Sequence, residues 1–267
     1  MWASIKHMLR AYRCYDGKVA RADLARWYTS PPGRSLAESE QALLDDVLSN
    51  LFGYHLLQVT APQGHDLSTI SRIPHRMLMT EPATVLMSSE QAPAYFLGQP
   101  EYLPLATESV DLVLLPHVVE FTDDPHAVLR EAERVLIAEG YVLVLGFNPW
   151  SLWGLWRLLF RWRRRAPWCG RFLSPWRMQD WLSLLGFKTV ALHHIYYRPP
   201  LSQPGFLQRL QFFESWGRHL WPVFGGVYLM VAKKRVLTLT PIRPRWRPQR
   251  AVVNPGFVSS TVGKLNG

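Results

Sequence analysis

Asp111-Leu-Val-Leu-Leu115, Pro125-His-Ala-Val-Leu-Arg-Glu-Ala-Glu-Arg-Val-Leu136 and Tyr141-Val-Leu-Val-Leu-Gly146 follow one another in the chain and decide its fold. The first and third runs are apolar at consecutive positions, which is typical of strands buried on both faces of a parallel sheet. The second run repeats its apolar residues at helical spacing. The segment therefore predicts a strand, a helix and a second strand, connected as a right-handed parallel crossover.

Shorter apolar runs on either side extend this pattern. We expect strands at 55–60, 76–80, 94–97, 187–192 and 227–232, and a helix over 175–185 that ends at Gly186. Together they predict an α/β protein with a doubly wound, mostly parallel sheet that spans residues 51–235. The Pro- and Arg-rich residues 236–267 are expected to form an extended basic tail.

Residues 1–50 precede the sheet and have a helical pattern. Ser35-Leu-Ala-Glu38 matches a capping box, in which the serine hydroxyl accepts from a backbone N–H and the glutamate reaches back. The apolar residues that fall near helical spacing are Leu36, Leu43, Leu44, Val47, Leu48 and Leu51. The sequence therefore predicts an N-terminal helical segment whose main helix starts at Ser35, buries one face and is closed by Gly53.

Charge is divided unevenly along the 267 residues. Residues 1–140 hold 11 Lys and Arg against 18 Asp and Glu, whereas residues 141–267 hold 19 against 2. Ten of the twelve tryptophans also lie after residue 149. The basic half indicates either a packed Trp and Arg face or an anionic partner. The two cysteines form neither a disulfide framework nor a metal-ligand pattern, and the first residues do not match a signal peptide. Both observations predict a cytoplasmic protein.

Residues 101–150 carry three motifs in a fixed order. They are LPLATESVDLVLLPHVVEF (103–121), VLREAERVL (128–136) and EGYVLVLGFNP (139–149). The combination resembles the class I S-adenosylmethionine-dependent methyltransferases, in the branch called methyltransferase type 11. The resemblance covers residues 52–150 well and extends loosely to about residue 235. It implies a Rossmann-like sheet of the seven-strand type and S-adenosyl-L-methionine as cofactor.

The cofactor loop of that family departs most from this sequence. The family places an acid-x-Gly-x-Gly-x-Gly loop after the first strand, where the glycines let the backbone approach the cofactor. The matching residues are Gln58-Val-Thr60-Ala-Pro62-Gln-Gly64, so one glycine remains. Three interpretations stay open. Gln58, Thr60 and Gly64 hold the cofactor in a modified way, or the fold has lost the cofactor, or the alignment is displaced by a few residues.

Two further places match the family's cofactor contacts. Glu81, with Glu90 as a second choice, follows the second strand, where the family's acid accepts from the ribose hydroxyls. Gln99 and Glu101 match the family's acid-Ala-Glu turn, whose acid bonds the adenine. An amide can bond an adenine edge as an acid does, so Gln99 is a plausible substitute. Each of these residues is equally well explained as a polar residue at a strand end or turn.

Leu115, Pro116 and His117 follow the strongest predicted strand at its carboxyl end. Open α/β sheets bind their ligands at this end, so Leu115 and Pro116 are cofactor-contact candidates. His117 is a candidate general base or substrate-orienting group, because an imidazole titrates near neutral pH. A structural role for a single loop histidine is the alternative. No metal site is expected.

Residues 148–176 form an insertion rich in Trp and Arg after the fifth strand, where related enzymes keep a substrate cover. A helix there would carry an apolar face bordered by arginines. It would either pack on the core or contact an anionic membrane surface through Trp153, Trp156, Arg157, Arg161 and Arg164. Nucleic acid is a third and weaker interpretation, because no known RNA-binding motif is present.

Two functions follow from these observations. The first is S-adenosylmethionine-dependent methyl transfer to an unidentified small or lipid-like acceptor, which the three retained motifs favour. The second is a catalytically inactive relative that binds an anionic membrane surface, nucleic acid or a protein partner, which the substituted glycine loop favours. Either protein would be cytoplasmic or peripheral to a membrane.

Overall fold

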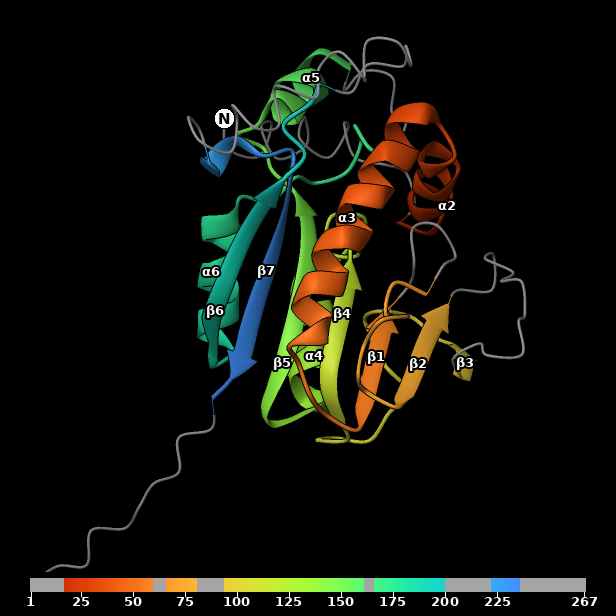
Figure 1. Cartoon of the computed structure of the whole chain (residues 1–267), viewed down its shortest axis with the longest axis vertical. Helices are drawn as coiled ribbons and strands as arrows, with labels where there is room; N and C mark the ends of the chain where they lie inside the picture. Colours follow the sequence, from red (N-terminus) through yellow and green to blue (C-terminus); the bar gives the residue numbers. More distant parts are fainter. Residues whose placement is uncertain (1–16, 60–65, 81–93, 161–165, 200–221, 236–267) are drawn as a thin grey trace, which may run out of the picture. The chain divides into compact units, whose positions relative to one another are not determined.

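A seven-stranded sheet organises the computed structural model, which describes residues 17–59, 66–80, 94–160, 166–199 and 222–235 (Figure 1). The strands lie in the order β3-β2-β1-β4-β5-β7-β6. Strands β1 to β5 pair in parallel, and β7 runs antiparallel between β5 and β6. Their bounds are β1 His55–Val59, β2 His75–Thr80, β3 Ala94–Leu97, β4 Val110–Pro116, β5 Leu136–Phe147, β6 Phe187–Ile195 and β7 Val227–Lys234. The predicted mostly parallel sheet is confirmed.

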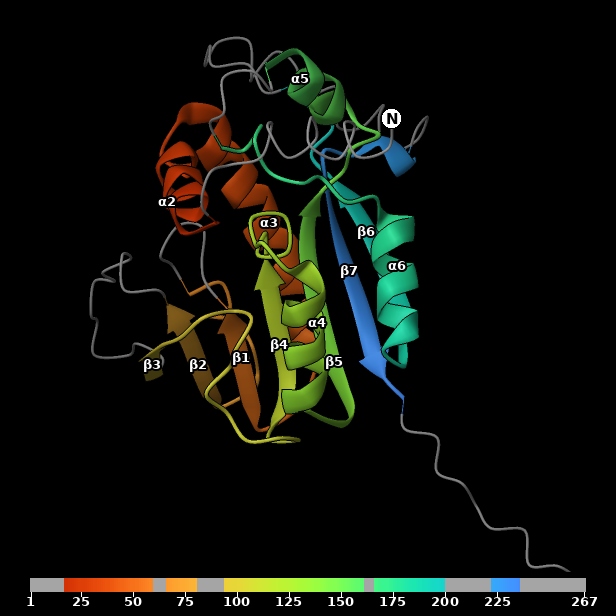
Figure 2. The ribbon, with the colours of Figure 1, turned by 180° about the vertical axis from the view of Figure 1, so that it is seen from behind.

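Helices cover both faces of this sheet. Figures 1 and 2 show α3 across one face, and α4 and α6 across the other. Successive side chains of a strand point to opposite faces, so β4 divides its residues between two cores. Leu112 and Leu114 pack with the helices before the sheet, whereas Val113 and Leu115 pack with α4 and α6. The helices are α2 Gly17–Tyr28, α3 Pro31–Ser49, α4 Pro125–Val135, α5 Leu152–Phe160, α6 Pro175–Leu184 and the 3-10 turn η2 Pro222–Phe224.

The limits of α3 differ from the sequence prediction. The N-cap is Ser30, whose hydroxyl accepts from the backbone N–H of Gly33 at 3.4 Å, and two prolines follow it. Proline suits the first helical turn because its φ is already helical and its missing N–H would have no partner there. Ser35 therefore lies inside the helix, and the predicted capping box is wrong. The helix also ends before Gly53, at Ser49, with Asn50 as its C-cap.

The connection between β1 and β2 is unusual for a parallel pair. Such connections usually contain a helix, yet residues 66–74, the described part of this one, form turns and bends. Leu67 and Ile73 bury their side chains in the core on the α3 side. Gln41 of α3 donates to the carbonyl of Leu67 at 3.3 Å, and Arg76 pairs with Asp66 at 2.7 Å. Packed turns therefore occupy the position after β1.

Three expectations concern the wider protein. No helix within the described ranges is long and apolar enough to cross a membrane. Cys14 lies outside the described residues, so the expectation of a reducing compartment stays a prediction. The tail predicted for residues 236–267 lies outside the described residues.

Candidate functional site

The ends of the parallel strands bring the predicted site residues to one edge of the sheet, at the top in Figure 1. His117 follows β4 directly and has a φ of 54°, in the left-handed region that residues other than glycine seldom adopt. Its backbone N–H donates to the carbonyl of Leu145 on β5 at 3.1 Å. This turn places the imidazole in the interior, with a side chain that is 0% exposed.

Four buried polar residues meet around that imidazole, and we call them the His117 cluster: Tyr28, Glu40, His117 and Glu120. Nε2 of His117 lies 3.0 Å from Oε1 of Glu40, and Nδ1 lies 3.2 Å from Oε2 of Glu120. The hydroxyl of Tyr28 donates to both oxygens of Glu40, at 3.1 and 3.0 Å. Buried charges are stable only when they are paired and hydrogen-bonded, and each of these groups has such a partner.

The two carboxylates control the charge of the ring. Burial alone would lower the pKa of His117, but the neighbouring charges of Glu120 and Glu40 outweigh it and raise that pKa to about 10. Burial, followed by the charge of Glu40, raises the pKa of the Tyr28 hydroxyl. At neutral pH His117 is therefore an imidazolium that donates from both nitrogens.

Phe147, the last residue of β5, connects the cluster to its aromatic surroundings. Its backbone N–H donates to Oε1 of Glu120, and its ring centre lies 4.2 Å from that of His117. The other side of Phe147 faces Phe172 and Trp153, with ring centres at 5.0 and 5.6 Å and nearly parallel planes. The cluster is therefore enclosed by packed aromatic rings.

This arrangement limits the chemistry of His117. A general base needs an unprotonated nitrogen that faces its substrate, and here each ring nitrogen lies within hydrogen-bond distance of a buried carboxylate. A charged and enclosed group of this kind fixes the positions of the elements that contribute to it. The cluster joins α2, α3 and the loop after β4, and through Phe147 it also joins β5.

Gln58 lies near the end of β1 and is 1% exposed. Its Oε1 accepts from the backbone N–H of Leu67 at 2.9 Å. The side chain thus holds the returning end of the β1–β2 connection against the strand. Thr60 and Gly64, the other two predicted contacts of this loop, lie outside the described residues, as does Glu81 after β2.

Gln99 and Glu101 lie in the turn that follows β3. The carbonyl of Gln99 accepts from the N–H of Tyr102 at 3.0 Å, and the side chain of Gln99 is exposed. Thr122, in the loop after β4, donates its hydroxyl proton to Oε1 of Glu101. The ends of β3 and β4 are therefore joined, and Gln99 faces solvent beside that junction.

Leu115 and Pro116 form the end of β4, and both are buried. Leu115 belongs to the core against α4 and α6, so its side chain contributes to packing. The sequence analysis did not assign Glu40, Glu120 or Tyr28. Glu40 follows Leu36 and precedes Leu44 at spacings of four, on the face that the same pattern predicted to be buried. A carboxylate between these two buried leucines indicated that a polar partner would be buried beside it.

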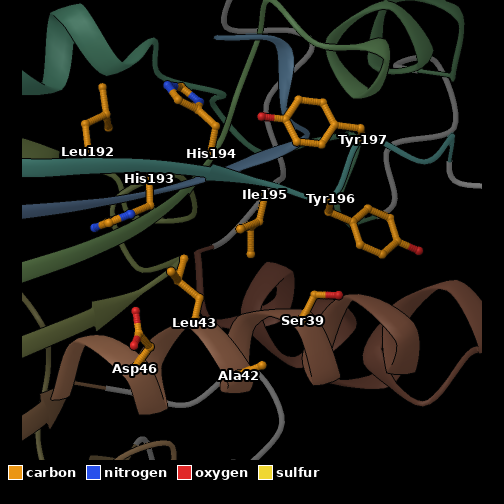
Figure 3. A pocket seen from close by; sticks show the side chains of 10 residues that line it. All are labelled: Ser39, Ala42, Leu43, Asp46, Leu192, His193, His194, Ile195, Tyr196 and Tyr197. Carbon is orange, nitrogen blue, oxygen red and sulfur yellow. The ribbon is translucent and has the colours of Figure 1, made fainter. Parts of the chain in front are cut away.

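A separate groove of about 590 Å³ lies between α3 and β6. Figure 3 shows His193 and Ile195 pointing toward α3, whereas Leu192 and His194 point away from it. Burial, followed by the charge of His193, lowers the pKa of His194. This groove lies at the β6 side of the sheet, away from the β1–β4 edge. Within the described ranges, no group of three or more His, Cys, Asp or Glu side chains is placed to hold a metal ion.

Comparison with solved structures identifies the fold. A methyltransferase from Thermotoga maritima, described as a possible histamine N-methyltransferase, superposes with a TM-score of 0.57 at 18% identity, over 79% of this chain and 93% of that one. An S-adenosylmethionine-dependent methyltransferase from Archaeoglobus fulgidus gives 0.52 at 18% identity, over 73% and 92%. Together with the sheet order, these similarities establish the class I methyltransferase fold.

Sequence comparison places the chain more narrowly. The methyltransferase domain model of the type 11 branch matches residues 74–144. YafS, an uncharacterized protein of Escherichia coli, is 31% identical over 214 residues, which are 80% of this chain and 82% of YafS. A malonyl-[acyl-carrier protein] O-methyltransferase of Laribacter hongkongensis is 32% identical over 102 residues, 38% of this chain and 34% of that one. The chain belongs to the same methyltransferase-fold family as YafS, and the domain match implies S-adenosylmethionine as its cofactor.

Proposed function

We propose that this protein binds S-adenosylmethionine at the edge formed by β1, β3 and β4 and transfers its methyl group to an acceptor. The observation that carries the proposal is the convergence of three strand ends at the position where this fold binds ligands. Gln99 offers an exposed amide there, and the bond from Thr122 to Glu101 holds its turn against the loop after β4. The residues at this edge fit an adenosyl group.

The described residues would bind and position rather than react. The amide of Gln99 would hydrogen-bond the adenine, and Gln58 would fix the turn that borders the methionine end. The bound cofactor supplies an electrophilic methyl group on a sulfonium sulfur. Methyl transfer needs chiefly the placement of the acceptor in line with that bond. The His117 cluster would serve this by holding the loops after β4 and β5 in one arrangement.

The acceptor that we propose is a small or lipid-like molecule. Helix α5 lies beyond the edge of the sheet to which the parallel strands point (Figure 1), and Leu152, Leu155, Leu158 and Leu159 on it are exposed. An apolar acceptor would find contacts there, since apolar surface removed from water is the main source of binding free energy for such molecules.

A second candidate function is a methyltransferase fold that no longer binds the cofactor. The β1–β2 connection supports it, because residues 66–74 form packed turns where a helix N-terminus would otherwise contribute unpaired N–H groups. The sequence between β1 and these turns also lacks two of the three expected glycines. In this case the protein would act through its surfaces alone.

Calorimetric titration of the full chain with S-adenosylmethionine separates the two functions without knowledge of the acceptor. We expect saturable heat and a thermal upshift, both weakened roughly tenfold in affinity by Gln99→Ala, about the value of one or two lost hydrogen bonds. Gln179→Ala is the matched control, because Gln179 is an exposed glutamine on α6. Absence of binding at millimolar ligand would leave the second function.

A further inference from the structure

Helix α5 is fixed to the body of the protein along one side. Trp153 is 1% exposed and its indole N–H donates to the carbonyl of Arg198 at 2.9 Å. Its ring stacks on Phe147 and meets Trp27 edge-on at 5.6 Å. The hydroxyl of Ser151 accepts from the N–H groups of Trp153 and Gly154, at 3.2 and 3.4 Å, and so caps the helix. The orientation of α5 is therefore set by burial and by capping.

The other side of α5 exposes large apolar side chains. The exposed fractions are 46% for Leu152, 57% for Leu155, 73% for Leu158 and 58% for Leu159, and Trp150 just before the helix is 60% exposed. Residues 152, 155 and 159 follow the three-and-four spacing of a single helix face. Adjacent exposed leucines on a helix that is already anchored indicate a surface that contacts something apolar.

The 3-10 turn η2 adds to the apolar surface at this end of the sheet. Val223 and Phe224 are 38% and 50% exposed. The side-chain amide of Asn148, just after β5, donates to the carbonyls of Val223 and Gly225 at 2.7 and 3.0 Å. Figures 1 and 2 show α5 and η2 at the same end of the sheet. We call Trp150, Leu152, Leu155, Leu158, Leu159, Val223 and Phe224 the apolar end surface.

Positive charge accompanies this surface. Arg157 of α5 lies over the ring of Phe172, with its guanidinium carbon 5.1 Å from the ring centre. The sequence that follows the helix is Arg161-Trp-Arg-Arg-Arg165, and residues 141–267 hold 19 Lys and Arg against 2 Asp and Glu. A helix that binds an anionic bilayer places leucine and tryptophan side chains at the acyl boundary and arginine side chains at the level of the lipid phosphates.

The length of α5 decides how it would meet a bilayer. Nine helical residues extend about 14 Å, roughly half of the hydrocarbon thickness, so the helix would lie in the interface rather than cross it. The sequence analysis left open whether Trp153 packs on the core or contacts a membrane surface. The structure buries Trp153, which holds the helix to the core, while Trp150 and the four leucines face outward.

We propose that the apolar end surface docks on an anionic membrane, with α5 lying in the headgroup region. The leucines and Trp150 enter the acyl boundary, and Arg157 and the net positive charge of this half of the sequence favour lipid phosphates. This interaction does not depend on whether the protein binds S-adenosylmethionine, so the two proposals can fail separately.

Vesicle flotation of the full chain tests the proposal. We expect flotation with phosphatidylcholine vesicles that contain about one third phosphatidylglycerol, little with phosphatidylcholine alone, and weakening as salt is raised. The double variant Leu155→Glu with Leu158→Glu should lose at least roughly tenfold in partitioning, because two charges replace apolar anchors. Trp150 fluorescence, compared between the chain and a Trp150→Phe variant, should shift to shorter wavelength on binding.

The matched control is Leu184→Glu. Leu184 is 78% exposed, slightly more than Leu158, but it lies at the last residue of α6. We expect this variant to float like the parent chain. Equal flotation of both variants, absence of flotation of the parent chain on anionic vesicles, or binding to RNA without binding to vesicles would each overturn the proposal. An unchanged urea-unfolding curve of the double variant would show that its loss of flotation is not misfolding.

Discussion

Replacing Glu40 with glutamine removes one of the two carboxylates that keep His117 charged in the interior. Glutamine has nearly the same shape and can still accept from Tyr28, so the main change is the loss of one charge. His117 would keep its contact with Glu120, whose Oε2 lies 3.2 Å from Nδ1. The protonated form of the ring would then be less stable than in the parent chain. We expect Glu40→Gln to destabilise the fold and to lower the pKa of His117.

The magnitude follows from the pKa shift. The pKa of His117 rises from 6.5 to about 10 although burial opposes the rise, and each unit corresponds to about 1.4 kcal/mol, so the folded state favours the protonated ring by about 5 kcal/mol net of burial. Glu120 is the larger of the two causes that raise this pKa, so Glu40 accounts for somewhat less than half of the stabilisation. Glu40→Gln should therefore lower the free energy of unfolding by about 2 kcal/mol.

The loss should depend on pH in a defined direction. Below pH 6.5 the folded and unfolded states both protonate His117, and the full contribution is present. Between 6.5 and about 10 only the folded state keeps the proton, so stability falls as pH rises. In the variant, the fall of stability with rising pH ends at a lower pH, because the folded-state pKa of its His117 is lower. The difference between the two proteins is thus full at neutral pH and narrows toward pH 10.

Urea unfolding followed by tryptophan fluorescence measures the free energies, and nitrogen NMR of the imidazole measures the protonation of His117. Glu38→Gln is the control, because Glu38 lies on the same helix and is exposed. If Glu40→Gln were as stable as Glu38→Gln, or if the ring of His117 were neutral at about pH 7 in the parent chain, the charged cluster would be the wrong description.

Three further predictions concern stability, each measured by urea unfolding. Ser30→Ala should cost about 1 kcal/mol by removing the N-cap of α3, whereas Ser35→Ala should cost less than half of that; the reverse order would restore the sequence-based start of the helix. Tyr228→Phe should leave stability unchanged or raise it by up to about 1 kcal/mol, because the buried hydroxyl has no hydrogen-bond partner in the described structure, and a clear loss would reveal one. Trp153→Ala should cost about 3–5 kcal/mol as a buried aromatic removed from a packed cluster, and a cost under 1 kcal/mol would contradict its anchoring role.

Local sequence pattern was sufficient for most of the sheet. The predicted strands at 94–97, 111–115 and 141–146 are present, the latter two as parts of longer strands. Runs of consecutive apolar residues are hard to place anywhere except in a sheet covered on both faces. The crossover from β4 through α4 to β5 formed as predicted, because its helix has one apolar face of the width that the sheet buries.

Side-chain partners that are distant in sequence were not predictable in the same way. Glu40 and His117 are 77 residues apart, and no local pattern relates them. The predicted N-terminus of α3 was wrong because the prediction relied on Ser35 and Glu38, three residues later. Ser30, which two prolines follow, was the better choice, since proline restricts the backbone more strongly. The place of Trp153 stayed open in the sequence because tryptophan suits a core and an interface equally, and its ring contacts with Trp27, Phe147 and Tyr196 decide for the core.

Phe147 contacts both the His117 cluster and helix α5. Its backbone N–H donates to Glu120 of the His117 cluster. Its ring stacks on Trp153, which anchors α5 to the core. A displacement of that helix by lipid would have to move the phenyl ring or break the stack. Where a ligand at the strand edge and a bilayer both shift this ring, thermodynamic reciprocity makes each change the affinity for the other by an equal factor.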